Sequence, residues 1–284
     1  MIRLGAVLPT GSVDETIAMA ERLGLWGTAA PLPLEATEAE AAAVGRRFRD
    51  AGLRLVQLAC YRNVSTPVPE ERRRAVRDLV RALHLAAAAG VLHVVTGAGH
   101  RDPSQPQATF AVHPDNFSDR ALEDLAATCR EVLETAGDVP VRLLVETWVM
   151  TPLSSLTRAS EAVRRVAHPR FGILFDPVNL MNLDVYFDNG SFLARAVQQL
   201  GPAIGIVHAK DTLLHPERFT FQLAEEPVGQ GALDYGALLR ALATLPGDVP
   251  LLVEHVPDEA GVRAALDHIR AVAERVGVEV RGRA

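Results

Sequence analysis

The sequence predicts an α/β fold, a closed (β/α)₈ barrel that forms one domain over residues 1–284. Three observations lead to this prediction. Short apolar runs of strand character alternate eight times with helical segments, at about 35 residues per unit, which favours a parallel sheet. No linker, low-complexity tract or change of composition divides the chain. Eight such units without a large insertion favour a closed barrel over an open sheet.

The amino-terminal half supplies the first four units. Capping boxes formed by Ser12 with Glu15 and by Thr37 with Glu40 mark the starts of two helices, and Gly90 ends a third. The expected strands cover residues 2–8, 27–30, 53–59 and 91–96. The expected helices cover about 12–23, 37–51, 67–89 and 118–136.

The carboxy-terminal half supplies four more units of the same kind. The expected strands cover residues 141–146, 171–176, 204–208 and 250–254. The expected helices cover about 154–166, a segment that ends near 200, 235–243 and 259–276. The segment between the seventh strand and its helix is long and is expected to be a loop.

Each of the last four strands ends on a side chain that can bind a divalent cation. These residues are Glu146, Asp176, His208 and Glu254. Because the carboxyl ends of barrel strands meet at the mouth of the barrel, the four side chains are expected to converge there. Three carboxylates and one imidazole suit Mn²⁺ best, with Mg²⁺ or Co²⁺ as alternatives, so we expect one divalent metal as cofactor.

The order Glu, Asp, His, Glu on strands five to eight resembles the xylose-isomerase-like TIM-barrel superfamily of sugar phosphate isomerases and epimerases. Two further segments resemble it, Phe175-Asp176-Pro177 and the run from Val228 to Asp234. The resemblance covers essentially the whole chain. It implies that Glu146 and Glu254 both hold the metal and exchange a proton with the substrate.

The sequence departs from parts of this superfamily in three places. Asn179 stands where the ketose 3-epimerases and the nuclease branch usually have histidine, and Leu214 stands where the epimerases have arginine. The Asp-x-His ligands of the trinuclear nucleases are not found after Lys210. The run His208-x-Lys210-Asp211 resembles the inosose isomerase and dehydratase branches better.

Lys210 is a third candidate catalytic residue. It is the single lysine among 29 basic residues, so this chain uses arginine wherever charge alone is needed. It lies two residues beyond His208, which places it on the same face if the strand continues. A compact or deprotonatable amine beside the metal would explain a lysine here; a solvated loop lysine is the alternative.

Three residues are candidates for substrate binding. Trp148 can form an apolar wall for a sugar-like ring or pack against the helices. Asn179 can bond a substrate hydroxyl or cap the next helix. His100 lies with Arg101 in a loop over 97–117 that is long enough to close over the site.

These features favour a metal-dependent isomerase or epimerase acting on a sugar, ketose or inosose through a metal-stabilised enediolate. A hydro-lyase of the inosose dehydratase type uses the same site and also expels a hydroxyl, with Lys210 or a loop histidine as the acid. A non-enzymatic sugar-binding barrel is the alternative from another class. An abasic-site nuclease is disfavoured because its additional ligands are missing.

The composition restricts the partners. A net charge of −6 gives no reason to expect nucleic acid or an anionic membrane surface. Cys60 and Cys129 form no disulfide framework, and no signal peptide or membrane span is recognised, so a cytoplasmic location is expected. The expected partner is a small polyhydroxy carbonyl substrate, and a homo-oligomer is left open.

Overall fold

A closed barrel of eight parallel strands forms the centre of the computed structural model, which describes residues 1–217 and 219–283. Consecutive strands pair with one another, and the last pairs with the first to close the barrel. This confirms the predicted fold class. The barrel strands are β1 (Ile2–Ala6), β2 (Gly27–Ala29), β3 (Arg54–Ala59), β4 (His93–Gly97), β5 (Arg142–Glu146), β6 (Phe171–Phe175), β7 (Ile204–Ala209) and β10 (Val249–Val253).

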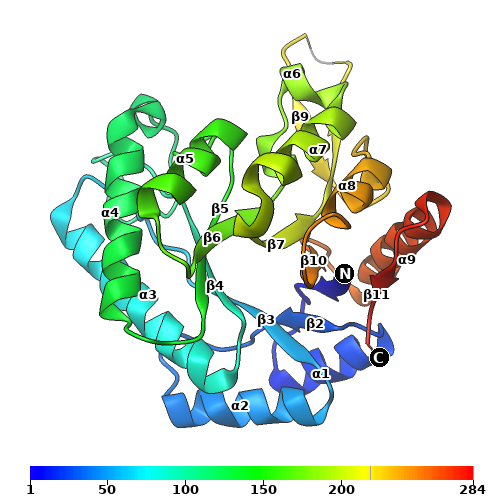
Figure 1. Cartoon of the computed structure of the whole chain (residues 1–284), viewed down its shortest axis with the longest axis horizontal. Coiled ribbons are helices and arrows are strands. Elements are labelled where there is room, and N and C mark those ends of the chain that lie inside the picture. The colour runs from blue at the N-terminus through cyan, green and yellow to red at the C-terminus, as the bar shows by residue number, and fades with distance from the viewer. Residues whose placement is uncertain (218, 284) are drawn as a thin grey trace.

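An outer ring of helices surrounds the strands (Figure 1). Its members are α1 (Val13–Arg22), α2 (Glu38–Asp50), α3 (Pro69–Ala89), α4 (Asp119–Thr135), α5 (Leu156–Val166), α7 (Asn189–Leu200), α8 (Tyr235–Leu242) and α9 (Glu259–Val276). The predicted capping box of Thr37 and Glu40 is present, whereas Glu15 bonds the backbone of Gly11 instead of completing a box with Ser12. In the described part of the chain, no helix has the length and apolarity to cross a membrane.

Several short elements were not predicted from the sequence. They are the helix α6 (Leu183–Tyr186), the 3₁₀ turns η1 (Pro114–Phe117), η2 (Val178–Leu180) and η3 (Gly201–Ala203), and the strands β8 (Asp211–Leu214), β9 (Leu223–Glu226) and β11 (Val280–Arg281). The prediction of a plain loop after strand seven was wrong, because β8 and β9 form an antiparallel hairpin there. Their sequences lack the alternation that predicts a strand. The hairpin projects beyond the barrel (Figure 1).

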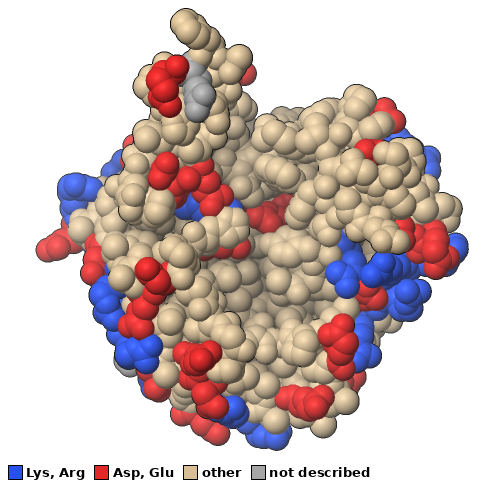
Figure 2. Space-filling model, turned by 180° about the vertical axis from the view of Figure 1, so that it is seen from behind, with Lys and Arg blue, Asp and Glu red and all other residues tan. Residues whose placement is uncertain are grey.

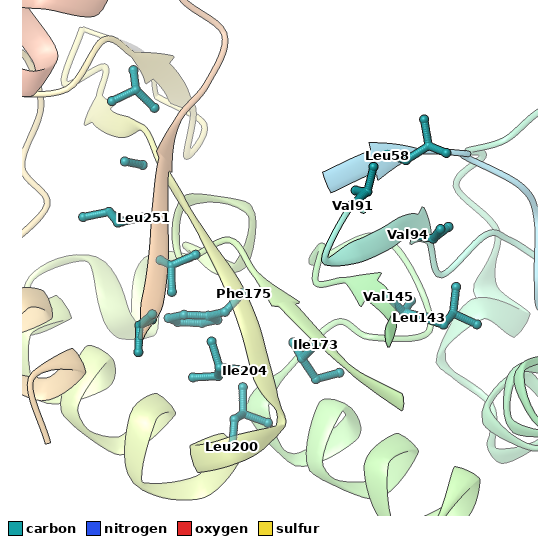
Figure 3. Packing of buried hydrophobic residues seen from close by; sticks show 14 of the residues in the cluster. Leu58, Val91, Val94, Leu143, Val145, Ile173, Phe175, Leu200, Ile204 and Leu251 are labelled. Carbon is teal, nitrogen blue, oxygen red and sulfur yellow. The ribbon is translucent and has the colours of Figure 1, made fainter. Parts of the chain in front are cut away.

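The strand side chains divide into two apolar layers. Leu143, Val145, Ile173 and Phe175 belong to the large cluster between strands and helices, part of which Figure 3 shows. A smaller cluster fills the barrel interior with Val56, Val95, Leu144, Leu174, Ile206 and Leu252. Because side chains alternate between the two faces of a strand, the second residue after an inner-layer position faces inward as well.

Glycines make room for the inner layer. A Cβ at Gly172 or Gly205 would lie 2.8 Å or 2.7 Å from the side chain of Leu144. Both distances are too short for ordinary contact, so the interior admits Leu144 only beside these two glycines. The inner layer is thereby filled up to the level at which the strand-end residues begin.

We expect Leu144→Ala to lower the free energy of unfolding by about 2–5 kcal/mol, because it leaves a cavity in a closed interior that cannot collapse easily. Urea unfolding monitored by circular dichroism measures this change. Leu183→Ala is the matched control, since Leu183 is 55% exposed, and a surface truncation should stay within about 0.5 kcal/mol. Equal losses for the two variants would contradict the description of the inner layer.

Candidate active site

The four strand-end side chains lie together at the carboxyl ends of their strands. They are Glu146 at the end of β5, Asp176 directly after β6, His208 in β7 and Glu254 directly after β10, and we call them the strand-end cluster. One ligand atom from each lies within 4.8 Å of all the others. Each side chain is at least nine-tenths buried. The cluster continues the inner face of the barrel, two residues beyond Leu144, Leu174, Ile206 and Leu252.

The donor atoms of this cluster fit a divalent cation. His208 Nε2 lies 3.1 Å from Gln57 Oε1, which can only accept, so Nε2 carries a proton and Nδ1 is the nitrogen that can offer an electron pair to a cation once it is deprotonated. His208 Nδ1 and Asp176 Oδ2 are both buried, and neither meets a partner in good hydrogen-bond geometry, although Glu254 Oε2 and Lys210 Nζ respectively lie 2.9 Å away. A cation bound by both atoms would satisfy them, and the carboxylates of Glu146 and Glu254 would complete its ligands.

Charges crowd at this cluster. Burial raises the pKa of Glu146, although the His208 imidazole opposes the shift. Burial also acts against a charged Glu254, but His208 and Lys210 outweigh it and lower the pKa of that carboxyl. For His208, burial lowers the pKa, and the carboxylates of Glu254 and Glu146 outweigh burial and raise it above its ordinary value. A cation must therefore displace a proton from His208 when it binds.

Lys210 is buried beside the strand-end cluster. Its ammonium lies 2.9 Å from Asp176 Oδ2, 3.2 Å from Glu254 Oε2 and 3.4 Å from Glu225 Oε2. Burial acts against a charged amine, but these carboxylates outweigh it and raise the pKa of Lys210. Only 2% of the side chain is exposed, so Lys210 is not a solvated loop lysine.

A cavity of about 390 Å³ opens over the cluster. It is lined by Tyr61, Phe110, Glu146, Trp148, Asn179, Lys210, Glu225, Glu254 and His255. Figure 2 shows a hollow that contains acidic side chains, beside the projecting hairpin. A cavity of this size, with a few convergent polar groups, is typical of a small-molecule site.

One wall of this cavity is aromatic. The ring centroids of Tyr61 and Phe110 are 5.9 Å apart, and Phe110 meets Trp148 edge to face at 5.1 Å. Tyr61 Oη donates to Glu146 Oε2, and Asn179 Nδ2 donates to Glu146 Oε1, both at 2.9 Å. Two donors therefore fix the orientation of the Glu146 carboxylate.

A second cavity of about 500 Å³ lies at the opposite end of the barrel, around the amino ends of the strands. Two of its arginines already have partners within the protein. Arg3 pairs with Asp248, and Arg142 donates to backbone carbonyls, including that of Ala203. Burial lowers the pKa of His93 to about 3, so this histidine is neutral. Among the residues that the structure describes, this larger cavity gathers no cluster of metal-binding side chains like the one at the carboxyl ends of the strands.

The comparison with protein families agrees with the resemblance seen in the sequence. The family described as xylose isomerase-like TIM barrel matches residues 17–272. The chain belongs to this family. Comparison of this xylose isomerase-like barrel with curated protein sequences gives no match.

Solved structures share the fold over nearly the whole chain. A 3-keto-D-glucoside 4-epimerase from E. coli has a TM-score of 0.69 at 16% identity, over 95% of this chain and 100% of its own. A probable 3-DHS dehydratase from Bacillus anthracis has a TM-score of 0.70 at 15% identity, over 95% of this chain and 99% of its own. A xylose isomerase-like TIM barrel protein from Mycobacterium smegmatis, solved in complex with magnesium, has a TM-score of 0.66 at 18% identity, over 92% of this chain and 88% of its own. At these identities the likeness concerns the fold.

Of the three predicted substrate-binding residues, two line the cavity and one does not. Trp148 and Asn179 line the cavity of this xylose isomerase-like barrel. His100 does not line it. Its ring is fully buried, with Nε2 2.8 Å from the carbonyl of Ala108 and Nδ1 accepting from the backbone of Asp102. We therefore correct the prediction for His100, which orders the long loop instead of facing the cavity.

Other residues of the cavity were missed in the sequence. Tyr61 and Phe110 come from loops after β3 and β4, where no periodicity marks them. Glu225 lies on β9, in the segment expected to be a loop. His255 directly follows Glu254, and a histidine next to a predicted ligand was a usable signal. Gln57, the partner of His208, is a polar residue within an apolar strand.

The run from Val228 to Asp234, which follows the hairpin, is bound by the side chain of Asp211. Its carboxylate accepts backbone N–H bonds from Gly229 at 3.0 Å and from Leu233 at 2.9 Å. A Cβ at Gly231 would lie 2.3 Å from Asp211 Oδ1. These residues therefore hold the run against β8.

We expect Gly97→Ala to disturb the aromatic wall, because the new Cβ would lie 2.6 Å from a ring carbon of Phe110. Overpacking of this kind costs about 1–3 kcal/mol of unfolding free energy, and the displaced Phe110 should change the fluorescence of Trp148. Gly11→Ala is the control, since its Cβ would have 3.7 Å to its nearest neighbour. Unchanged stability and fluorescence in Gly97→Ala would contradict the packing described.

Proposed function

We propose that this protein is a divalent-metal-dependent isomerase or epimerase of a small polyhydroxy carbonyl compound, a sugar, ketose or inosose. The observation that carries the proposal is the strand-end cluster at the floor of a cavity with an aromatic wall. Sharing its fold with a 3-keto-D-glucoside 4-epimerase supports the proposal. Fold alone does not assign an activity, so the argument depends on the site.

Glu146, Asp176, His208 and Glu254 would hold the ion. Mn²⁺ is our first choice for this donor set, with Mg²⁺ and Co²⁺ as alternatives; the Mycobacterium smegmatis protein was solved with magnesium. When bound, a divalent ion stabilises negative charge that develops on substrate oxygens.

The two glutamates are proposed to move the proton. One carboxylate takes the proton from the carbon next to the carbonyl, which leaves an enediolate, and the other carboxyl returns a proton to the same or the neighbouring carbon. Tyr61 and Asn179 orient Glu146, while Lys210 lies 3.2 Å from Glu254. The aromatic wall would pack on the C–H face of the substrate and exclude water there.

A hydro-lyase is the second candidate. The ammonium of Lys210 is buried against the cluster and can supply a proton to a departing hydroxyl. An eliminating enzyme needs such an additional acid, whereas an epimerase already has two glutamates. The probable 3-DHS dehydratase from Bacillus anthracis shares the fold.

Proton exchange distinguishes these functions. We expect the Mn²⁺-loaded protein in D₂O to place deuterium on the carbon next to the carbonyl of at least one member of a panel of ketoses, aldoses and inososes, without loss of water. NMR and mass spectrometry of the recovered sugar measure both events. Glu146→Gln and Glu254→Gln should each slow the exchange by about 10²-fold or more, since they remove the proton carriers.

Glu217→Gln is the control, because Glu217 is 60% exposed on the hairpin. Exchange accompanied by loss of water would replace the isomerase with the hydro-lyase. Binding of a panel member without any exchange would leave a sugar-binding barrel.

Lys210→Arg is expected to reduce the exchange rate by about 10²-fold, because a guanidinium cannot reproduce the contacts of one compact ammonium with three carboxylates and would misplace Glu254. The bulkier side chain would also have to fit a site in which the ammonium already lies 2.9 Å from Asp176. Metal content measured on the same sample tells a misplaced glutamate from a lost ion. Normal exchange by the metal-loaded variant would reduce Lys210 to a replaceable cation.

A further inference from the structure

We infer that the substrate is uncharged: an unphosphorylated, carboxylate-free polyol-like molecule whose distal hydroxyls meet the pair Glu225–His255. The inference rests on the proposed function and concerns the substrate class of the same cavity. It follows from the charges around the cavity and from what each of them already contacts.

Negative groups dominate the surroundings of the cavity. Four carboxylates lie there, those of Glu146, Asp176, Glu225 and Glu254. Against them stand one ammonium, Lys210, and one imidazole on the cavity wall, His255. A divalent ion in the strand-end cluster would bring the site to neutrality at most, even with His255 protonated.

The cationic groups on the cavity wall are already occupied. Lys210 lies within 3.4 Å of three carboxylates, those of Asp176, Glu254 and Glu225. His255 Nδ1 lies 2.6 Å from Glu225 Oε1, and its Nε2 lies 3.7 Å from Glu254 Oε2. No arginine lines this cavity among residues 1–217 and 219–283.

A phosphate monoester would be poorly accommodated under these conditions. It carries nearly two negative charges at neutral pH and is usually bound by arginine forks, lysines or free backbone N–H groups. Here it would have to displace a carboxylate from Lys210 or lie against Glu225. A neutral sugar meets no such cost, since its hydroxyls can donate to the carboxylates and its C–H face can pack on Trp148.

Glu225 and His255 form the polar wall of the cavity. His255 has a φ of 56°, a left-handed conformation that non-glycine residues adopt rarely. The chain turns there immediately after Glu254, where the His255 side chain meets Glu225 on β9. The pair therefore presents both a carboxylate and an imidazole to hydroxyl groups of a substrate whose carbonyl end lies at the strand-end cluster.

Binding of matched pairs tests the inference. The probes are D-fructose with D-fructose 6-phosphate and 1-phosphate, and L-ribulose with L-ribulose 5-phosphate, added to the metal-loaded protein. The chain has two tryptophans, so Trp26→Phe leaves Trp148 as the reporter inside the cavity. Calorimetry on the unsubstituted protein gives a second readout that does not depend on that substitution.

We expect a neutral sugar to change the fluorescence and its phosphate ester to bind about tenfold more weakly or worse, as like charges brought together require. An ester that binds as tightly as its parent sugar would overturn the inference, and so would silence of every neutral probe at saturating concentration. Deuterium exchange on phosphate esters alone would refute the inference and leave the proposed function standing. Binding of a neutral sugar without deuterium exchange on any probe would refute the proposed function and leave the inference about the cavity standing.

Glu225→Gln is the decisive variant, because it removes one negative charge from the cavity wall and one partner from Lys210. It should lower the ratio of the dissociation constant of the phosphate ester to that of the neutral sugar several-fold. Glu226→Gln is its matched control, as it makes the same change on the next residue of β9, which does not line the cavity. Equal effects of the two variants would mean that overall charge, and not the wall, excludes phosphate.

Discussion

Repulsion among buried carboxylates is the constraint on which the rest of the site depends. Glu146, Asp176 and Glu254 place an oxygen each within 4.8 Å of one another, in a position from which water is largely removed. Isolated charges in such a position are costly unless they are paired. His208 and Lys210 supply part of the compensation through their 2.9 Å contacts with Glu254 and Asp176, and a cation between the four ligand atoms would supply the rest.

The barrel makes this concentration of charge sustainable. Each cluster residue lies at a strand end, directly above an interior filled by Leu144, Leu174, Ile206 and Leu252. These strands are held on both sides by parallel neighbours in a closed sheet, so the backbone positions from which the carboxylates extend are fixed relative to one another. A rigid support of this kind keeps ligands close enough together to share one ion.

The sequence predicted the parts of the site that depend on periodicity. Apolar runs that end in Glu146, Asp176, His208 or Glu254 place these residues on the inner face, because side chains alternate along a strand and barrel strands converge. The contribution of Tyr61, Phe110 and Glu225 depends on how their loops pack, which one sequence does not reveal. Phe110 fits because Gly97 leaves space for its ring, and Glu225 reaches Lys210 only through a hairpin that the pattern did not predict.

The prediction for His100 failed for a related reason. A histidine in a long loop over the site was expected to face a substrate, but its two ring nitrogens are used within that loop. A buried polar side chain usually forms hydrogen bonds with its neighbours in the protein, and only the folded structure shows whether a donor or acceptor remains for a substrate. Asn179 shows the same principle, because its amide bonds Glu146 and thereby serves the site as an orienting group.

Anomalous diffraction from crystals grown with Mn²⁺ tests the central claim most directly. The account predicts one strong peak per chain, within about 2.0–2.6 Å of a carboxylate oxygen from Glu146, Asp176 and Glu254 and of Nδ1 of His208. Crystals of the Asp176→Ala variant grown under the same conditions should lack the peak and retain the barrel. A peak elsewhere, or none at the strand-end cluster with saturating Mn²⁺, would contradict the account.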